Sequence, residues 1–451
     1  MATTSIGRQS GSTATPTKAT FSYWLKGQHD GTQQGIWGWH RGNDASNYWL
    51  GIYYSTNGSM YFNWKQSGSS VCTLGTTQKF RDATAWQHHV LAIDTTLSTA
   101  ADRVKWYING VRVTSFEDSL DTISQNTTIT NWSNAQDKME IGTWYQSSTA
   151  RNLNNHSLSH FHMTDGYAYD ASAFGSTDST TGEWKINTSP SVTYGNEGVF
   201  MFKDDAALTD RSGNGNNFTL DGGTLVQIDD CPSDNFATWN PLISNSGATF
   251  KNSSYRVYRT SAGNYRRIGC TLGATSGKYY AEYFLGTDQW GGVCLTNGGD
   301  LARTQAGNNG YMGEYADDKS VGIRQDGVVY SSGANVSSAQ WNQGTISGSD
   351  RLCIALDMDN KKCFLGKNGT WSSSSNPATN TGGISLTGDS YTFACATSNA
   401  DCIINTGNGN FANGNTANLI SSEGTNASGI GKFEYDVPSG FTALSTKGLN
   451  L

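Results

Sequence analysis

The stretch from Arg351 to Gly369 reads RLCIALDMDNKKCFLGKNG, and it decides the structure of the second half of the chain. Apolar residues alternate with small or polar ones from Leu352 to Asp357, which is the two-residue period of a strand with one apolar face. Turn-forming residues follow at Asp359 and Asn360, and the chain returns through a second apolar run to the turn at Asn368-Gly369. The pattern predicts an antiparallel hairpin.

The first half of the chain contains a counterpart, WQHHVLAIDTTLSTAADRVKWYINGVRV, from Trp86 to Val113. An apolar strand ends at Asp94, a polar turn follows, and a second alternating run continues to Asn109-Gly110. Because the same device occurs once in each half, the sequence indicates two related β-sandwiches.

The composition places the chain in the all-β class. Its 451 residues exceed one ordinary domain, and 53 glycines with only 15% charged residues are typical of short strands joined by turns. The formal net charge of −7 includes no basic block, so neither nucleic acid nor an anionic membrane surface is expected as a partner. We therefore expect two tandem antiparallel β-sandwiches.

The expected domain organisation follows from changes in polarity along the chain. Residues 1–18 are polar and suggest a lead-in or attachment segment. The first sandwich is expected over 19–230, with added strands or a connector from about residue 170, and the second over 231–451. The start of the chain lacks the basic and apolar regions of a secretory signal, and no later run has the length of a membrane span.

Several motifs in the second half resemble the SPRY family in their order. They are GKYYAEYFLG at 277–286, SVGIRQDG at 320–327, the hairpin at 351–369 and VPSGFTALSTKGLN at 437–450. The first half is similar to laminin-G-like and concanavalin A-like jelly rolls through FSYWLKG, WQHHVLAID and DRVKWYINGVRV. These resemblances imply the same fold class as the composition.

The two modules together, with the connecting motifs YGNEGVF, DRSGNGNNF and DNFATWNPL, resemble structural or fibre proteins of marine bacteriophages. The resemblance implies a virion component made in the host cytoplasm without a signal peptide and displayed as a fibre, appendage or decoration. Its implied partners are other virion proteins, further copies of the chain (three in a fibre) and a host-surface glycan or protein. Host adhesion and a purely architectural role in capsid or tail both remain open.

Aromatic residues beside turns or strand ends are the candidates for ligand binding, because a flat ring can cover the apolar side of a sugar. The candidates are Trp39, Arg41, Trp132, Trp144 and Tyr145 in the first sandwich, and Trp290, Tyr311, Tyr315 and Trp371 in the second. The competing interpretation is that these residues fill the cores or their rims.

The sequence gives little support for an enzyme. A retaining glycosidase needs two carboxylates about 5 Å apart, and no strand carries the Glu-x-Asp-x-Glu spacing that would supply them. Glu314 with Asp317 and Asp318 is the nearest approach, in a polar turn. All seven histidines precede residue 163, which excludes a Ser-His-Asp site within the second sandwich. His160 and His162 form a pair on one strand, which alone is weak evidence for a metal site.

Calcium is the one cofactor that the sequence suggests. Asp204, Asp205, Asp210, Asn214 and Asp221 bracket a glycine-rich loop, and such oxygen donors suit calcium. The alternative is an Asx-turn network that holds the loop. The eight cysteines follow no zinc-ligand spacing and are expected as small buried residues. Cys353 with Cys363 is the first pair to suspect of forming a disulfide.

Overall fold

The computed structural model describes residues 4–27, 29, 31–42, 46–120, 123–146, 149–152, 156–203, 208–243, 247–259, 265–296, 310–409, 420 and 422–451, and for 119–120, 145–146, 149–152 and 243 the backbone alone. The chain divides into two compact units, Met1–Gln227 and Ile228–Leu451. The sequence analysis places this division after residue 230. Within the described ranges, none of the helices has the length and apolarity of a membrane span.

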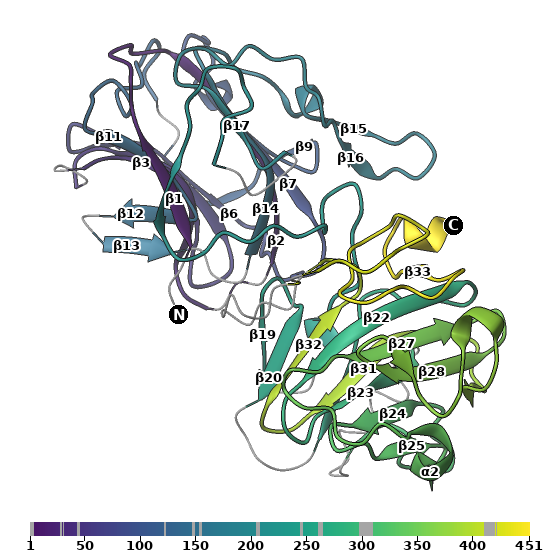
Figure 1. Ribbon diagram of the computed structural model, residues 1–451. Helices are drawn as coiled ribbons and strands as arrows, with labels where there is room; N and C mark the ends of the chain where they lie inside the picture. The colour runs from purple at the N-terminus through teal and green to yellow at the C-terminus, as the bar shows by residue number, and fades with distance from the viewer. Residues whose placement is uncertain are drawn as a thin grey trace. The chain divides into compact units, whose positions relative to one another are not determined.

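The first unit is built from two antiparallel sheets (Figure 1). The eight-stranded sheet contains, in spatial order, β10 (Phe116–Leu120), β6 (Ser69–Thr76), β5 (Met60–Gln66), β4 (Trp49–Tyr54), β3 (Gln34–Arg41), β11 (Asp137–Ile141), β1 (Ser5–Gln9) and β18 (Thr219–Gly222). The six-stranded sheet contains β17 (Val199–Met201), β14 (His156–Asp165), β2 (Lys18–Gly27), β7 (Gln87–Asp94), β8 (Val104–Ile108) and β9 (Val111–Arg112). The 3-10 turns η1 (Ala100–Asp102) and η2 (Ala171–Ala173) lie between strands.

Alternating apolar residues from both sheets form the core of the first unit. Phe21 of β2 stacks on Trp37 of β3, with ring centroids 4.0 Å apart, and this contact joins one sheet to the other. Both side chains are fully buried. The period-two pattern in the sequence therefore predicts this core correctly, because each strand turns one set of side chains into the space between the sheets.

Residues 5–9 are not a loose lead-in. They form β1, which pairs with β11 on one side and β18 on the other. Ile6 enters the core and is 2% exposed, while Arg8 points the same way into a buried polar network. The sequence analysis missed this strand because SIGRQ contains a single large apolar residue, and its pairing partners lie far along the chain.

The segment after residue 165 adds structure to both sheets of the first unit. β17 lies at an edge of the six-stranded sheet and β18 at an edge of the eight-stranded sheet. β15 (Gly175–Thr177) and β16 (Trp184–Ile186) form a two-stranded sheet of their own. Phe174 and Trp184 from this segment pack with Val90 and Tyr107 of the six-stranded sheet. This contact covers the face of the sheet that is turned away from the core.

The second unit also has two sheets. The nine-stranded sheet contains β19 (Ala248–Lys251), β20 (Arg256–Arg259), β32 (Asp401–Asn405), β22 (Lys278–Leu285), β27 (Leu352–Asp357), β28 (Lys362–Lys367) and β29 (Thr370–Trp371), with β30 (Ile384–Ser385) on β28 and β33 (Thr442–Ala443) parallel to β22. The six-stranded sheet contains β21 (Arg266–Gly269), β31 (Tyr391–Thr397), β23 (Trp290–Leu295), β24 (Val321–Arg324), β25 (Val329–Ser331) and β26 (Ala334–Asn335). Short helical turns are α2 (Ser337–Gln340), η3 (Pro241–Ile243), η5 (Pro377–Thr379) and η7 (Gly448–Asn450).

The predicted hairpin is confirmed as β27 and β28, with Leu352 opposite Lys367 and Asp357 opposite Lys362. Asp357 accepts hydrogen bonds from the backbone and side-chain nitrogens of Asn360, which closes the turn. The cysteine pairing is wrong, since Cys353 lies opposite Gly366 and Cys363 opposite Leu356. Both are buried thiols, as the alternative interpretation expects.

In each unit the first and last segments meet. In the first unit β1 and β18 are neighbouring strands of one sheet. In the second unit Phe236 bridges to Ser445, and the Ala237 backbone N–H donates to the Leu444 carbonyl over 2.9 Å. Each unit is therefore closed on itself, and the fold class predicted from the sequence, all-β with two antiparallel sandwiches, is confirmed.

Candidate functional site

Two of the candidate tryptophans belong to the core of the first unit. Trp39 and Trp132 are fully buried, and their ring centroids lie 5.6 Å apart. The prediction that they bind a ligand is therefore wrong, because a side chain without exposed surface cannot contact one. Alternation along β3 places Trp37 and Trp39 on one face, but the sequence does not say which face is inside.

Arg41 at the end of β3 is engaged within the protein. Its guanidinium donates two hydrogen bonds to the Asp137 carboxylate, at 2.7 and 3.2 Å. It also lies over the ring of Tyr48, 3.7 Å from the centroid. The hydrogen bonds to Asp137 raise the pKa of Arg41, and the charge is already matched by a carboxylate. Arg41 thus fixes the end of the strand.

Trp144 is covered as well, although it lies outside the core. It is 1% exposed and stacks on Tyr53 of β4, with centroids 4.2 Å apart. It comes from the hairpin of β12 (Thr143–Gln146) and β13 (Thr149–Asn152), and its ring lies over Gly38 and Gly51. The side chain of the candidate Tyr145 lies outside the described residues. Trp144 is a packing residue and not an open platform.

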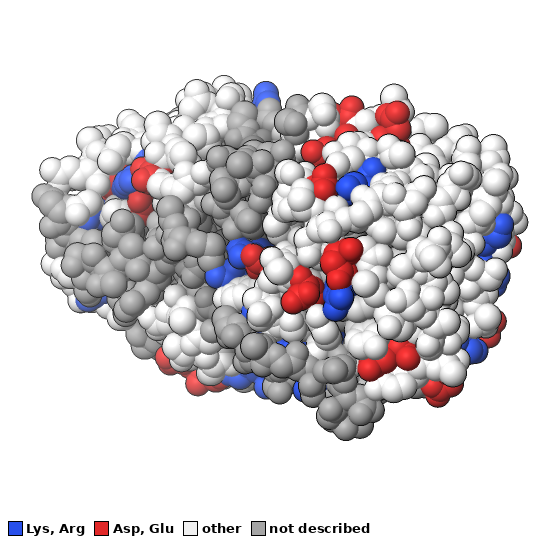
Figure 2. Space-filling model, turned by 60° about the horizontal axis from the view of Figure 1, so that its bottom comes forward, with Lys and Arg blue, Asp and Glu red and all other residues white. Residues whose placement is uncertain are grey.

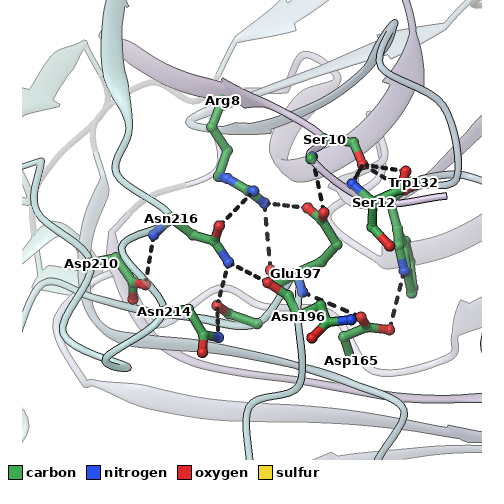
Figure 3. Close-up of polar contacts among 12 residues, drawn as sticks. Arg8, Ser10, Ser12, Trp132, Asp165, Asn196, Glu197, Asp210, Asn214 and Asn216 are labelled. Carbon is green, nitrogen blue, oxygen red and sulfur yellow. Dashed lines mark hydrogen bonds and ion pairs between the residues drawn. The ribbon is translucent and has the colours of Figure 1, made fainter. Parts of the chain in front are cut away.

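Two of the candidate calcium ligands, Asp210 and Asn214, take part in a hydrogen-bond network (Figure 3). Asp210 accepts from the backbone N–H groups of Phe200, Ser212 and Asn216 at 2.9–3.0 Å. The Asn214 amide donates to the carbonyls of Gly195 and Gly198.

Asp221 lies elsewhere, in an ion pair of 3.0 Å with Lys138. Asp204 and Asp205 lie outside the described residues. In the part of the chain that the structure describes, no three His, Cys, Asp or Glu side chains gather as a metal site would require. The loop at 210–216 has the Asx-turn contacts of the alternative interpretation, and calcium binding stays a prediction.

In the second unit Trp371 packs at the edge of the core. It is half-buried and meets the ring of Tyr280 edge-on, with centroids 6.2 Å apart. Its ring also lies against Gly366 of the neighbouring strand β28. Packing against β22 and β28 accounts for its position, so Trp371 fits the competing interpretation better than the binding one.

The structure does bring together two other candidates, Trp290 and Tyr311. Their rings stack with centroids 4.9 Å apart and planes 11° apart. Tyr265 meets both rings edge-on, and Tyr330 of β25 lies 5.2 Å from Tyr311. We call the four residues Tyr265, Trp290, Tyr311 and Tyr330 the aromatic face. Trp290 is buried beneath the others, whereas the three tyrosines are half-buried and keep part of their surface exposed.

The aromatic face lies on the outer side of the six-stranded sheet. Val293 and Ile323 of β23 and β24 turn into the core, so their neighbours in sequence turn outward. Two of the outward positions are Gly292 and Gly322, and an added Cβ would lie 3.0 and 2.6 Å from atoms of Met312. The absence of side chains there lets the segment with Tyr311 and Met312 lie directly on the sheet.

A buried ion pair holds this segment in place. Arg267 and Asp318 contact each other, and both side chains are 0% exposed. The Arg267 guanidinium also donates to the carbonyls of Gly310 and Tyr311. Because removing one partner of a buried pair is costly, Tyr311 is positioned by a rigid support. The sheet and this pair together preorganise the aromatic face.

Polar groups surround the rings. Arg324 of β24 lies 5.8 Å from the centroid of Trp290 and donates to both carboxylate oxygens of Asp326. Burial raises the pKa of Glu314 above its ordinary value, although Arg267 and Tyr315 lower it. Tyr315, the third candidate of this unit, is thus a neighbour of the aromatic face through Glu314. Rings and hydrogen-bonding groups lie within reach of one ligand.

The sequence analysis missed Tyr265, Tyr330 and Arg324. The signal for two of them is the alternation in VGIRQDGVVY, which places Arg324 and Tyr330 opposite the core residues Ile323 and Val329. Recognising this signal requires knowing that the outer side of the sheet carries other rings. Tyr265 precedes β21 and joins the face only through the fold.

The carboxylates considered for catalysis and the histidines considered for a metal site have other surroundings than those roles require. Asp318 is engaged by Arg267 and by Ser320, and Asp317 is exposed. His162 stacks on Phe200 with centroids 4.0 Å apart, and burial lowers its pKa well below the ordinary value. The ring of His160 lies 6.5 Å from that of His162. The two histidines are thus packed among aromatic side chains within the first unit.

Comparisons with known proteins give structural likenesses of low score. No protein-family model matches the chain, and no curated protein matches it. Laminin domains LG4-5 of the mouse alpha1 chain are 9% identical and cover 93% of this chain and 82% of their own, with a TM-score of 0.30. The SPRY domain of human HERC1 is 16% identical, with coverages of 37% and 96% and a TM-score of 0.27. A Ruminococcus gnavus sialidase CBM40 bound to sialyllactose is 13% identical, with coverages of 31% and 71% and a TM-score of 0.25.

Proposed function

We propose that the chain is a non-catalytic binding protein that holds a glycan on the aromatic face of its second unit. The observation that carries the proposal is the group of three half-buried tyrosines that surround buried Trp290 on the outer side of the sheet. Flat rings cover the apolar side of a sugar ring, and polar groups beside them bond its hydroxyls. Arg324 and Glu314 are such polar groups, and Asp326 holds the guanidinium of Arg324.

The wider role that we propose is attachment of a bacteriophage particle to its host. It rests on the resemblance of the sequence motifs to phage structural and fibre proteins, with the aromatic face as the contact surface. In this role the chain belongs to the virion as a fibre, appendage or decoration, associates with other virion proteins and with copies of itself, and contacts a bacterial surface glycan.

The proposal includes the absence of catalysis. A glycosidase needs one carboxyl group to protonate the leaving group and a second to act as nucleophile or base. Near the aromatic face Asp318 is buried in an ion pair, and Asp326 accepts from the guanidinium of Arg324. The hydrogen bonds from Arg324 lower the pKa of Asp326, so Asp326 is a poor proton donor. Binding without turnover is the function that this arrangement supports best.

Binding of the purified chain to intact bacteria and to their extracted polysaccharides tests the proposal. Tyr311→Ala and Tyr330→Ala should each weaken saturable binding about tenfold or more, which corresponds to about 1.4 kcal/mol. Tyr167→Ala is the matched control, since Tyr167 is 42% exposed on the first unit.

Three results would count against the proposal. Binding that all three variants retain would place the ligand elsewhere, and a wild-type chain that binds no cell or glycan would favour the architectural role. Release of reducing ends from a bound polysaccharide would contradict the absence of catalysis.

A further inference from the structure

The charges around the aromatic face bear on which glycans it accepts. Among the described residues, three cations, Arg266, Arg267 and Arg324, contact the face or its backbone. Three carboxylates accompany them: Asp318 pairs with Arg267, Asp326 pairs with Arg324, and Glu314 lies near Tyr311, whose pKa is raised by burial and then by the Glu314 charge. The sum of three positive and three negative charges is zero.

Of the two ion pairs in this set, a ligand can reach Arg324–Asp326, since Arg267–Asp318 is buried. The side chains are 32% and 41% exposed, and the guanidinium donates from Nε and Nη2 to the two carboxylate oxygens. Both donors of one edge of the guanidinium are thereby used. The Tyr265 hydroxyl also contacts the guanidinium of Arg324. An acidic sugar would have to displace Asp326 or lie beside its negative charge, whereas a sugar hydroxyl is uncharged and leaves the Arg324–Asp326 pair in place.

The side of the molecule drawn in Figure 2 shows no basic patch among the residues that it colours. On the side of the molecule drawn in Figure 2, uncharged residues cover most of the surface, and the acidic and basic ones lie intermixed. The formal net charge of the chain is −7. Long-range steering therefore does not favour a polyanion.

We propose that the aromatic face selects uncharged glycans, and that Asp326 sets this selectivity by occupying Arg324. This inference rests on the proposed function and names the ligand class of the same site. Stacking on the tyrosines supplies most of the affinity, and the matched pair beside them rejects carboxylated and sulfated sugars. Asp326 is a specificity-determining residue in this arrangement, while Tyr311 and Tyr330 contact the ligand.

The test is a comparison of one neutral and one acidic bacterial polysaccharide with the full chain and two variants. Asp326→Asn keeps an oxygen that can accept from the Val328 backbone N–H, as Asp326 Oδ1 does over 3.2 Å, so the local turn is retained. Asp389→Asn makes the same change of charge at an exposed position of the same unit and is the matched control.

We expect the wild-type chain to prefer the neutral glycan and to bind it almost equally from about 50 mM to about 500 mM salt, since no net charge is neutralised. Asp326→Asn should raise affinity for the acidic glycan about tenfold and leave affinity for the neutral one within about threefold. Asp389→Asn should change neither.

A wild-type chain that prefers the acidic glycan, or an Asp326→Asn variant with unchanged preference, overturns the selectivity while leaving glycan binding intact. Loss of all glycan binding in the wild-type chain instead overturns the proposed function, so the two failures are distinguishable.

Discussion

Glu282 of β22 is a titratable residue that lies in the interior of the second unit among several hydrogen-bond donors. It is fully buried, and its carboxylate accepts from the backbone N–H groups of Glu434 and Tyr435 at 2.9 and 2.8 Å. The Asn405 amide and the Tyr280 hydroxyl donate to it as well. Burial nevertheless raises the pKa of Glu282 to about 7. The residue ties the last segment of the unit to a central strand.

The raised pKa of Glu282 predicts a pH dependence of stability. Its ordinary pKa is 4.5 and its folded pKa is about 7, so the folded state binds the proton more tightly. This contribution is fully present below pH 4.5 and is lost as the pH rises through about 7. Urea unfolding should show the free energy of unfolding of the wild-type chain falling relative to Glu282→Gln by up to roughly 3 kcal/mol over that interval.

Glu282→Gln is itself expected to be less stable than the wild-type chain at low pH, because its amide nitrogen cannot accept from the surrounding N–H groups. Only the change of the difference with pH reports the titration. Parallel curves for the two proteins from pH 4.5 to pH 7 would contradict the raised pKa.

Gly51 of β4 gives a prediction about packing. An added Cβ would lie 2.5 Å from the Trp37 carbonyl oxygen and 2.7 Å from Cδ1 of Trp144. Gly51→Ala should therefore lower the free energy of unfolding of the first unit by roughly 1–3 kcal/mol in urea titrations. Gly42→Ala is the control, since the nearest atom there is 3.5 Å away. Equal stabilities for both variants would mean that the Trp37 backbone and the Trp144 ring both shift at little cost.

These residues also show what the sequence can predict at this scale. Alternation correctly groups Trp37 with Trp39 and separates them from Gly38, yet it assigns no group to the inside. In the first unit both sides of the eight-stranded sheet carry aromatic residues, because Trp144 covers Gly38 and Gly51. The burial of Trp39, Trp132 and Trp144 thus depends on tertiary contacts, which a single sequence does not encode locally.

At the scale of elements, β1 is held by side chains as much as by its ladder. Arg8 donates to Glu197 over 2.8 Å and to Asn216 over 2.9 Å, and Glu197 also accepts from the backbone of Gly11 (Figure 3). The side chains of Arg8 and Glu197 are 6% and 2% exposed. The motifs YGNEGVF and DRSGNGNNF therefore serve to fix the first strand from a distance of about two hundred residues.

Arg8→Ala should destabilise the first unit strongly, because it leaves Glu197 buried without its cation. Loss of one partner of such a pair costs about 3–5 kcal/mol. Urea unfolding measures the cost, and hydrogen exchange of the β1 amides should rise with it. Arg112→Ala breaks an exposed pair with Asp102, whose side chains are 38% and 37% exposed, and should cost no more than about 0.5 kcal/mol. Similar costs for the two variants would contradict this account of β1.

Elements with strong local signals are the ones that the sequence predicts well. The hairpin at 352–367 combines an apolar period with turn residues, and it is confirmed. β1 and the β15–β16 hairpin lack such signals, since their stability comes from segments distant in the sequence. In the loop at 210–216 the sequence analysis names Asp210 and Asn214, which both take part in its hydrogen bonds, but not Asn216, which holds β1 through Arg8.

At the scale of the whole molecule, each unit has a separate core. Phe21 against Trp37 spans the sandwich of the first unit, and Tyr283 against Phe393 spans that of the second. We expect fragments 1–227 and 228–451 each to fold alone, with circular dichroism like that of the full chain. Each should then unfold in one cooperative transition. A fragment that remains unfolded while the full chain is folded would mean that its sandwich depends on the other unit.

The repeated hairpin motif predicted two sandwiches because one short stretch contains a complete antiparallel unit: an apolar strand, a turn and a returning strand. The aromatic face could not be predicted in the same way. Its rings come from before β21, from β23, from β25 and from the segment at 310–312, which converge only when the six-stranded sheet is assembled. Two of its four members were nevertheless among the candidates, because rings beside turns are often near a surface.

The meeting of first and last segments within each unit has a consequence for evolution and engineering. A module whose entry and exit lie side by side can be spliced into a surface loop of a host protein, or duplicated in tandem, without stretching either chain. Here β1 neighbours β18 in the first unit, and Ala237 bonds Leu444 in the second. We therefore expect both sandwiches to tolerate insertion into another protein. We also expect them to tolerate circular permutation, in which the original termini are joined and new ones are placed at an exposed turn.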